Sequence, residues 1–522
     1  MMCLMVAAFF AATVAATELA ISDFYTAGVA EFQPIVSGMS SAEILQAHLQ
    51  GYREIITSAE AVATDIIVFP EGTLNSALTM TYVPDPQERR ILCNNGSMYR
   101  DFLVQLSCLA RNQRKYLVIN LTEQENCTTT SRDPRPCAAS GLNIYNTNVV
   151  FDREGRLISR YRKAHIYMEE RNTTIQPEHA IFDTDFGVRF GHFICFDLLF
   201  YAPAEQLIRK HGVQHIIFTS MFYSELPFLT AVQLQQSWAW ANNVNLLAAG
   251  ASYPEAGMTG SGIYAGERGT LNALMLGEGP GERRLLVAKV PKNLSSVTNL
   301  GNLQDMYNNA SVETHPPLKL MQDYQMENYT TQLLDLSQEQ HVQQSLCDKT
   351  GFCCHFYIET QALNTSSDSH AYKYRLALFN DERRYEQLEW SSLQICAIIA
   401  CTDNTLMSCG KIFNSSINYA NNFEFTTLEI EANFSKTVQL LLMPNSLNSA
   451  LYPLSPNTAE WKVVDESSYY TARFSLKHRL NNLLTFGIYG NYYDRSAALH
   501  QTFFISSSVL LVVVLLLTLI LR

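Results

Sequence analysis

Three short segments each place a reactive side chain at the end of a predicted strand. Glu71 follows the apolar run DIIVFP, Lys163 ends the segment RYRK, and Cys195 lies within HFICFD. Loops at strand ends are where a rigid scaffold commonly displays functional groups. Taken singly, each residue has an ordinary explanation, because such charged residues are usually solvated and a buried cysteine is usually inert packing. Together, a thiol, a carboxylate and an ammonium group have the types needed to attack an amide carbonyl.

Longer blocks around these residues resemble the nitrilase, or carbon–nitrogen hydrolase, superfamily. The segments are FPEG, YRK with Glu170 seven residues further on, and ICFDLLFYAPA. CNNGSMYRDF, YNTNVVFD, QSWAWANNVNLLA and MTGSGIYA further resemble its vanin and biotinidase branch. The resemblance covers nearly the whole mature chain and implies an α-β-β-α sandwich. It also implies a catalytic triad of Glu71, Lys163 and Cys195, with Glu170 as a supporting residue and the backbone N–H of Phe196 as an oxyanion donor.

The chemistry of such a triad follows from the residue types. The thiolate is the reactive form of cysteine, and Glu71 can take the thiol proton and pass it to the departing amine. The cation at Lys163 favours the thiolate and stabilises the oxyanion of the tetrahedral intermediate. An acyl-thioester forms on Cys195, and Glu71 then activates water to release the acid. The reaction requires neither a metal nor another cofactor, and we expect none.

Two histidines raise an alternative, a Cys–His hydrolase of the papain type. His192 lies three residues before Cys195 on a predicted strand, so its side chain should point to the opposite face of the sheet. His165 lies two residues after Lys163 and is not excluded by its spacing. A papain-like order would place the histidine after the cysteine, and the local sequence does not resemble that family.

Apolar runs and helical spacing alternate along the first 300 residues. We expect strands at 24–34, 65–70, 116–120, 186–196, 213–219 and 244–249, a hairpin over 146–163 that turns at Glu154-Gly155, and helices at 41–64, 101–111, 202–211 and 231–242. This alternation indicates an α/β sandwich with mixed sheets. After residue 300, polar segments alternate with short strands such as 428–434 and 437–443, which predicts a second, β-rich domain.

Both ends of the chain carry apolar segments typical of processing signals. Residues 1–16 read as a secretory signal peptide cleaved after Ala16. The apolar run 509–521 follows a polar spacer and the small residues 496–498, which predicts a GPI-attachment signal with Ser496 as the attachment residue. A single-pass membrane tail is the alternative. The predicted organisation is therefore 1–16 signal peptide, 17–300 nitrilase domain, 301–490 C-terminal domain and 497–522 removed propeptide.

Glycosylation sequons and cysteines fit an exported protein. Each predicted glycosylation site is an Asn-x-Ser/Thr sequon: Asn95, Asn120, Asn126, Asn172, Asn293, Asn309, Asn328, Asn364, Asn414 and Asn433. Without Cys3, which leaves with the signal peptide, 11 of the 12 cysteines remain, an odd number. If Cys195 is the free thiol, four cysteines remain in the first half and six in the second, so each half can pair internally. Cys127 and Cys137 bracket one loop and are a predicted bridge.

The formal net charge of −12, with no long basic run, argues against a nucleic-acid partner. We expect a small-molecule amide substrate, attachment to the outer face of the cell membrane through the GPI anchor, and a monomer. The vanin resemblance implies hydrolysis of pantetheine to pantothenate and cysteamine. Hydrolysis of biotin amides is the alternative with the same chemistry, and a non-catalytic surface glycoprotein is the alternative from another class.

Overall fold

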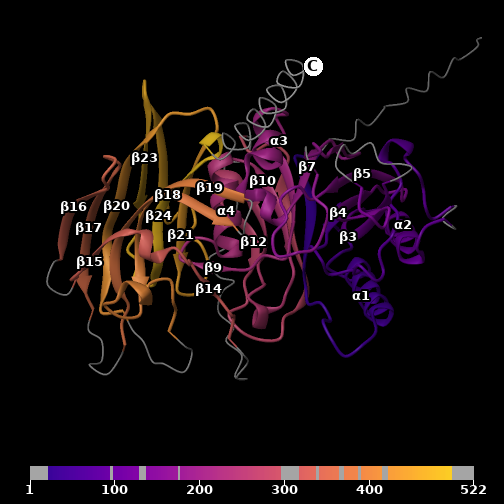
Figure 1. Cartoon of the computed structure of the whole chain (residues 1–522), viewed down its shortest axis with the longest axis horizontal. Helices are drawn as coiled ribbons and strands as arrows, with labels where there is room; N and C mark the ends of the chain where they lie inside the picture. Colours follow the sequence, from indigo (N-terminus) through magenta and orange to yellow (C-terminus); the bar gives the residue numbers. More distant parts are fainter. Residues whose placement is uncertain are drawn as a thin grey trace, which may run out of the picture.

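Two six-stranded sheets form the N-terminal part of the molecule (Figure 1). The computed structural model describes residues 22–94, 98–127, 137–174, 177–295, 317–336, 340–363, 370–385, 389–413 and 421–495. The first sheet has the order β13-β1-β2-β3-β4-β5, with strands β1 (Phe24–Phe32), β2 (Ile66–Val68), β3 (Tyr116–Asn126), β4 (Leu142–Phe151), β5 (Leu157–Arg162) and β13 (Arg283–Pro291). The second has the order β12-β11-β10-β8-β7-β6, with strands β6 (Ile181–Asp183), β7 (Arg189–Ile194), β8 (His215–Ser220), β10 (Asn245–Gly250), β11 (Ser261–Ala265) and β12 (Thr270–Leu274).

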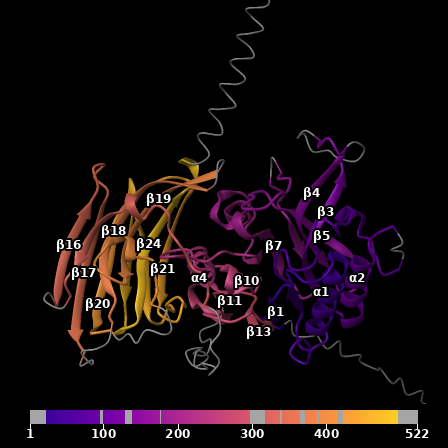
Figure 2. The ribbon, with the colours of Figure 1, turned by 60° about the horizontal axis from the view of Figure 1, so that its bottom comes forward.

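Side-chain alternation along the strands explains why these two sheets stack. On β1, Ala27 and Val29 belong to the same buried cluster as Ile217 of β8, so this face lies between the sheets. Ala30 and Phe32 belong to the cluster on the opposite face, which α1 (Ser41–Ile56) and α2 (Asp101–Gln113) cover. On the second sheet, α4 (Ala231–Asn242) packs between β10 and the C-terminal strands (Figure 2). The predicted α-β-β-α sandwich is confirmed.

Two of the predicted helices are too long. The helix expected over 41–64 ends at Ile56, because Thr57 and Ser58 turn their N–H groups back to Arg53 and Ile55 and tighten the last turn. The helix expected over 202–211 is reduced to α3 (Gln206–Arg209), preceded by a π-helical turn at Tyr201–Glu205. Ala202, the first residue of the predicted helix, has non-helical φ and ψ angles, because the ring of the following Pro203 disfavours the helical conformation. Short 3-10 turns occur at Pro86–Glu88, Cys195–Leu199, Pro254–Ala256, Gly266–Arg268, Met326–Asn328 and Leu406–Ser408.

The C-terminal part is a sandwich of two antiparallel five-stranded sheets (Figure 2). The inner sheet has the order β15-β18-β19-β24-β21, with strands β15 (Thr330–Leu334), β18 (Lys373–Tyr385), β19 (Glu389–Cys401), β21 (Leu440–Asn448) and β24 (Leu483–Tyr492). The outer sheet has the order β16-β17-β20-β23-β22, with strands β16 (His341–Cys347), β17 (Cys353–Ala362), β20 (Phe423–Ser435), β22 (Ala459–Asp465) and β23 (Tyr469–Leu476). The predicted β-rich character is confirmed, and the predicted boundary near residue 300 lies outside the described residues.

The two parts share one apolar core. Ala377 and Phe379 of β18 join the same buried cluster as Trp238 of α4. A short parallel ladder also joins them, because β14 (Met321–Gln322) pairs with β9 (Glu225–Leu226). The inner sheet therefore uses one face against the outer sheet and the other face against the N-terminal part, which fixes C-terminal side chains near the N-terminal strand ends.

Five disulfides staple the chain and leave one described cysteine free. The bridges join Cys93 to Cys108, Cys127 to Cys137, Cys347 to Cys353, Cys354 to Cys396 and Cys401 to Cys409. The predicted internal pairing of each half and the Cys127–Cys137 bridge are confirmed, as is the free thiol at Cys195. Across the described ranges, no helix has the length and apolar character to cross a bilayer. The predicted signal peptide 1–16, the propeptide 497–522 and Ser496 lie outside those ranges.

One predicted glycosylation site is wrong. Asn120 is 1% exposed, and its amide nitrogen donates to the side-chain oxygens of Asn146 and Asn148, so no glycan can be attached there in the folded protein. The other described sequons have surface access: Asn293, Asn328 and Asn433 are exposed, and Asn126 and Asn172 are half-buried. The sequons at Asn95, Asn309, Asn364 and Asn414 lie outside the described residues.

Candidate active site

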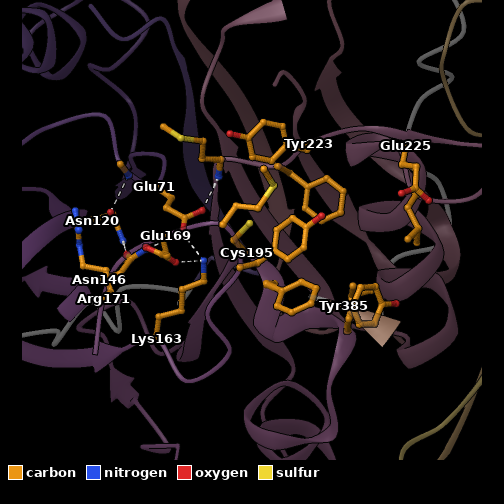
Figure 3. Close-up of a pocket in the computed structure, with 18 of the residues that line it drawn as sticks. Glu71, Asn120, Asn146, Lys163, Glu169, Arg171, Cys195, Tyr223, Glu225 and Tyr385 are labelled. Atoms are coloured by element: carbon orange, nitrogen blue, oxygen red, sulfur yellow. Dashed lines mark hydrogen bonds and ion pairs between the residues drawn. The ribbon is translucent and has the colours of Figure 1, made fainter. Parts of the chain in front are cut away.

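The three reactive residues picked out in the sequence meet in one cavity of about 780 Å³ (Figure 3). Glu71 follows β2 and Lys163 follows β5, both in the first sheet, whereas Cys195 follows β7 in the second. Residues of the inner C-terminal sheet complete the lining on the far side. The cavity therefore opens where strand ends of both N-terminal sheets face the C-terminal part.

A strained backbone turn presents Cys195. The chain passes directly from β7 into a 3-10 turn, and Cys195 has a φ of +46°, in the left-handed region that side chains other than glycine rarely adopt. The buried carboxylate of Asp197 holds this turn: it accepts the N–H of Ile194 at 3.1 Å, the N–H of His165 at 2.9 Å and the hydroxyl of Tyr161 at 2.8 Å. Such strain persists only where the surrounding structure holds it, and it is concentrated at functional sites.

An ammonium group lies between two carboxylates beside the thiol. Lys163 Nζ donates to Glu71 Oε1 at 2.7 Å and to Glu169 Oε1 at 2.6 Å. The amide nitrogen of Asn146 donates to the same two carboxylates, at 2.7 Å to Glu71 Oε1 and 2.9 Å to Glu169 Oε2. The other oxygen of Glu71 accepts the N–H of Met221 at 2.7 Å. The orientation of the Glu71 carboxylate is therefore set by three donors (Figure 3).

The prediction that Glu170 supports Lys163 is wrong by one residue. Glu169 makes the contact, whereas Glu170 is exposed and does not line the cavity. After Lys163 the chain runs as an irregular loop, so no helix or strand period relates the side-chain direction to the spacing. Two adjacent glutamates in such a loop cannot be told apart from the sequence.

A buried amide network behind Glu71 was also absent from the sequence predictions. Asn120 Oδ1 accepts the N–H of Gly72 at 2.9 Å, and Asn120 Nδ2 donates to Asn146 Oδ1 at 2.7 Å and to Asn148 Oδ1 at 3.1 Å. Each of these asparagines is less than 10% exposed. The available signal was that Asn146 and Asn148 share one face of β4 with the apolar residues Ile144 and Val150.

Burial and neighbouring charge determine which protonation state the thiol and the amine prefer. Burial and the charge of Glu71 raise the pKa of the Cys195 thiol well above its usual range, although Lys163 acts in the opposite direction. Burial alone would lower the pKa of Lys163, but Glu71, Cys195 and Glu169 raise it well above its usual range. The resting site therefore holds a neutral thiol near the Glu71 carboxylate and a protonated amine on Lys163.

Neither histidine of the papain-like alternative pairs with the thiol. His192 bonds to Ser159 at 2.8 Å and is fully buried away from the cavity, as its strand position predicted; burial lowers its pKa to about 3. Both ring nitrogens of His165 are occupied, one by Glu389 and one by the carbonyl of Ala202, each at 2.7 Å. The geometry therefore favours Glu71 over a histidine as the proton acceptor of Cys195.

Aromatic rings form the rest of the wall near the thiol. The Phe196 ring stacks on Tyr167 with centroids 4.8 Å apart and meets the Tyr385 ring edge-on at 5.0 Å. These contacts fix the residue whose N–H is the predicted oxyanion donor, and that role stays a prediction. The apolar lining between the charges around Lys163 and those around Arg383 suits a small organic molecule.

Comparison with known proteins gives matches to both parts of the chain. The carbon-nitrogen hydrolase family matches residues 31–259, and the Vanin C-terminal domain matches residues 318–496. Vanin-like protein 1 of Drosophila melanogaster is 45% identical over 492 residues, which cover 91% of this chain and 87% of that protein. Pantetheinase of Mus musculus is 30% identical (89% of this chain, 86% of that protein), and biotinidase of Bos taurus is 28% identical (88% and 89%). The chain belongs to the vanin family, a carbon–nitrogen hydrolase domain followed by a vanin C-terminal domain.

Proposed function

We propose that this protein hydrolyses the linear amide of pantetheine to pantothenate and cysteamine through an acyl-thioester on Cys195. The observation that carries the proposal is the meeting of Cys195, Glu71 and Lys163 in one cavity, where Lys163 Nζ donates to Glu71 at 2.7 Å. A thiol needs an adjacent base to become a nucleophile, and Glu71 is the group in position.

Acylation begins with a proton transfer. Glu71 takes the thiol proton as the sulfur attacks the amide carbon, and the carbonyl oxygen becomes an oxyanion. Lys163 Nζ and the Phe196 N–H stabilise that charge, which is most effective in a dry, preorganised site. Lys163 and Cys195 are only 2% and 7% exposed, so water competes little for either group. Glu71 then returns the proton to the amine, the C–N bond breaks, and cysteamine leaves.

Deacylation reverses these roles. Water enters the place of the amine, Glu71 takes one of its protons, and the oxygen attacks the thioester carbon. The second tetrahedral intermediate expels the Cys195 sulfur, which recovers its proton from Glu71. The product is pantothenate. Because Lys163 and Asn146 hold one Glu71 oxygen throughout, the carboxylate needs no reorientation between the two half-reactions.

Several features support pantetheine as the substrate. The cavity volume of about 780 Å³ is in the range of roughly 300–1,000 Å³ that encloses small organic ligands. The buried charges that line it are each paired with an opposite charge, Lys163 with Glu71 and Arg383 with Glu225, which suits a neutral chain such as pantetheine. A relative named pantetheinase is 30% identical over most of the chain.

The test measures two products in parallel. Purified protein should release cysteamine from pantetheine faster than it releases lysine from biocytin. Turnover of biocytin alone would replace pantetheine with biotin amides and leave the amide-hydrolase mechanism standing. Cys195→Ala should abolish both turnover and acyl-enzyme formation while the melting temperature stays unchanged; activity in that variant would refute the mechanism. Absence of turnover on any amide by the wild type would favour the non-catalytic glycoprotein.

We propose further that the protein is held on the extracellular face of the cell membrane by a GPI anchor at Ser496. Support comes from the tail composition and from the five disulfides, which persist in oxidising compartments. Phosphatidylinositol-specific phospholipase C should release the protein from cells. Retention on the membrane after complete digestion would favour a spanning tail.

A further inference from the structure

The cavity wall remote from Lys163 comes from the C-terminal part of the chain. Arg383 and Tyr385, at the end of β18, line the cavity together with Tyr324 and with Glu225 of β9. Figure 3 places Glu225 and Tyr385 on the side of Cys195 opposite to Lys163. A substrate whose amide carbonyl lies at the sulfur can therefore extend its acyl chain toward these residues.

Arg383 is the centre of that wall. Its Nη2 donates to both oxygens of Glu225, at 2.6 and 2.8 Å, and its Nη1 lies 3.0 Å from an oxygen of Asp323. The guanidinium carbon lies 5.2 Å from the centroid of the Tyr324 ring and 5.4 Å from that of Tyr385. The side chain is only 6% exposed, so its position and orientation are fixed before any substrate binds.

One nitrogen of this fixed guanidinium, Nε, is buried and has no hydrogen-bond partner among the described residues. Buried donors are nearly always satisfied, by protein, water or ligand, so an orphan donor beside a cavity calls for an acceptor from its contents. We expect a neutral acceptor, because a carboxylate or phosphate would be repelled by Glu225 and Asp323, the two carboxylates already paired with Arg383.

Two ring contacts connect this donor to the thiol. The Tyr385 ring packs on the guanidinium at one side and meets the Phe196 ring at 5.0 Å at the other, and Phe196 directly follows Cys195. The donor and the nucleophile are therefore held in a fixed relation by packed side chains.

We infer that Arg383 is a specificity-determining residue, and that its Nε–H donates to a neutral hydroxyl oxygen at the acyl end of the substrate. This inference rests on the proposed function, because pantetheine carries hydroxyl groups and an amide carbonyl at that end. It gives the C-terminal domain a role in choosing the substrate, whereas the chemistry stays with the N-terminal domain.

The experiment compares pantetheine with a pantetheine analogue in which the acyl-end hydroxyls are replaced by hydrogen. The wild type should hydrolyse pantetheine with a kcat/KM at least tenfold above that of the analogue, as expected when a built polar partner loses its acceptor. Arg383→Lys keeps the positive charge but has no Nε–H in a fixed plane, so the ratio should fall to about twofold or less. Arg375→Lys, on the same strand and outside the cavity, is the matched control and should retain the wild-type ratio.

Tyr324→Leu provides a second variant that does not depend on the buried ion pairs. Tyr324 is 62% exposed, so its replacement should leave the melting temperature unchanged while loosening one side of the guanidinium and lowering the ratio about threefold. A wild-type ratio near one overturns the inference, as does an unchanged ratio in Arg383→Lys. If Arg383→Lys does not fold, an unchanged ratio in Tyr324→Leu overturns it. No pantetheine turnover by the wild type would instead refute the proposed function.

Discussion

Asn146→Ala tests whether the amide network behind the site is needed to hold the base. The side chain of Asn146 donates to Glu71 at 2.7 Å and to Glu169 at 2.9 Å, and it is braced from behind by Asn120. Alanine removes both donated hydrogen bonds and adds no charge. Lys163 keeps its contacts with the two carboxylates, so the variant isolates the amide contribution.

The size of the effect follows from the bonds lost and kept. A hydrogen bond to a charged group contributes about 1.5–3 kcal/mol. Glu71 keeps the donors Lys163 and Met221, so we expect about 2 kcal/mol of the transition-state stabilisation to be lost rather than the sum of both bonds. At about 1.4 kcal/mol per factor of ten, this corresponds to a roughly 30-fold lower kcat. KM should change less, because Asn146 acts on the groups that move protons.

Steady-state kinetics on the best amide substrate gives kcat and KM, and thermal unfolding checks the fold. Asn143→Ala is the matched control, because Asn143 is a buried asparagine on the same strand that bonds to the hydroxyl of Tyr145 and lies outside the cavity. A folded Asn146→Ala enzyme with wild-type kcat would refute the positioning role. An equal loss of kcat in Asn143→Ala would assign the effect to the strand rather than to the carboxylate contacts.

Three further predictions concern single residues. Glu169→Gln should lower kcat/KM at least tenfold and Glu170→Gln less than twofold, because Glu169, unlike Glu170, contacts the amine of Lys163; steady-state rates that rank the other way would contradict the geometry. Burial raises the pKa of Glu31 to about 7 against an ordinary 4.5, so the folded state binds the extra proton and wild-type stability should fall by about 3 kcal/mol as the pH rises from 4.5 through 7. Glu31→Gln should remove this pH dependence of stability. If the free energy of unfolding decreases equally in both proteins between pH 5 and pH 8, the effect does not come from Glu31. Peptide mass spectrometry should find a glycan at the exposed Asn433 and none at the buried Asn120 of the folded, secreted protein.

Strands and helices could be predicted from the sequence where a segment showed one clear pattern of apolar residues. The run Asp65–Pro70 is apolar because β2 is buried on both faces, and the helix expected over 231–242 coincides with α4. The errors were helix ends and strands that were not predicted at all: β6, β11, β12 and β13 lie outside every expected strand. The predicted helix over 41–64 continued past Ile56 because apolar residues recur beyond it, but of these only Ala61 is buried and Val62 is 76% exposed.

Glu71, Lys163 and Cys195 could be predicted from the sequence because each follows a predicted strand with a reactive side chain. The residues that hydrogen-bond to them could not. Asn146 and Asn148 look like ordinary polar positions on a strand, and their role depends on Asn120 from a neighbouring strand in the same sheet. Glu169 contacts Lys163 through an irregular loop in which adjacent side chains have no fixed direction. Hydrogen-bond partners of this kind are set by tertiary packing, which spacing does not encode.

The same distinction separates the reaction from its substrate. The groups proposed to break the amide all belong to the first 200 residues and follow strands whose pattern is strong. Arg383 reaches the cavity because β18 belongs to the apolar core that both parts of the chain share and because Glu225 and Asp323 neutralise its charge in a buried place. Removing one partner of a buried ion pair is strongly destabilising, so Arg383 can be replaced in relatives only when Glu225 and Asp323 change with it. Relatives that share the three reactive residues but differ at these paired positions should therefore catalyse the same amide hydrolysis on different acyl chains.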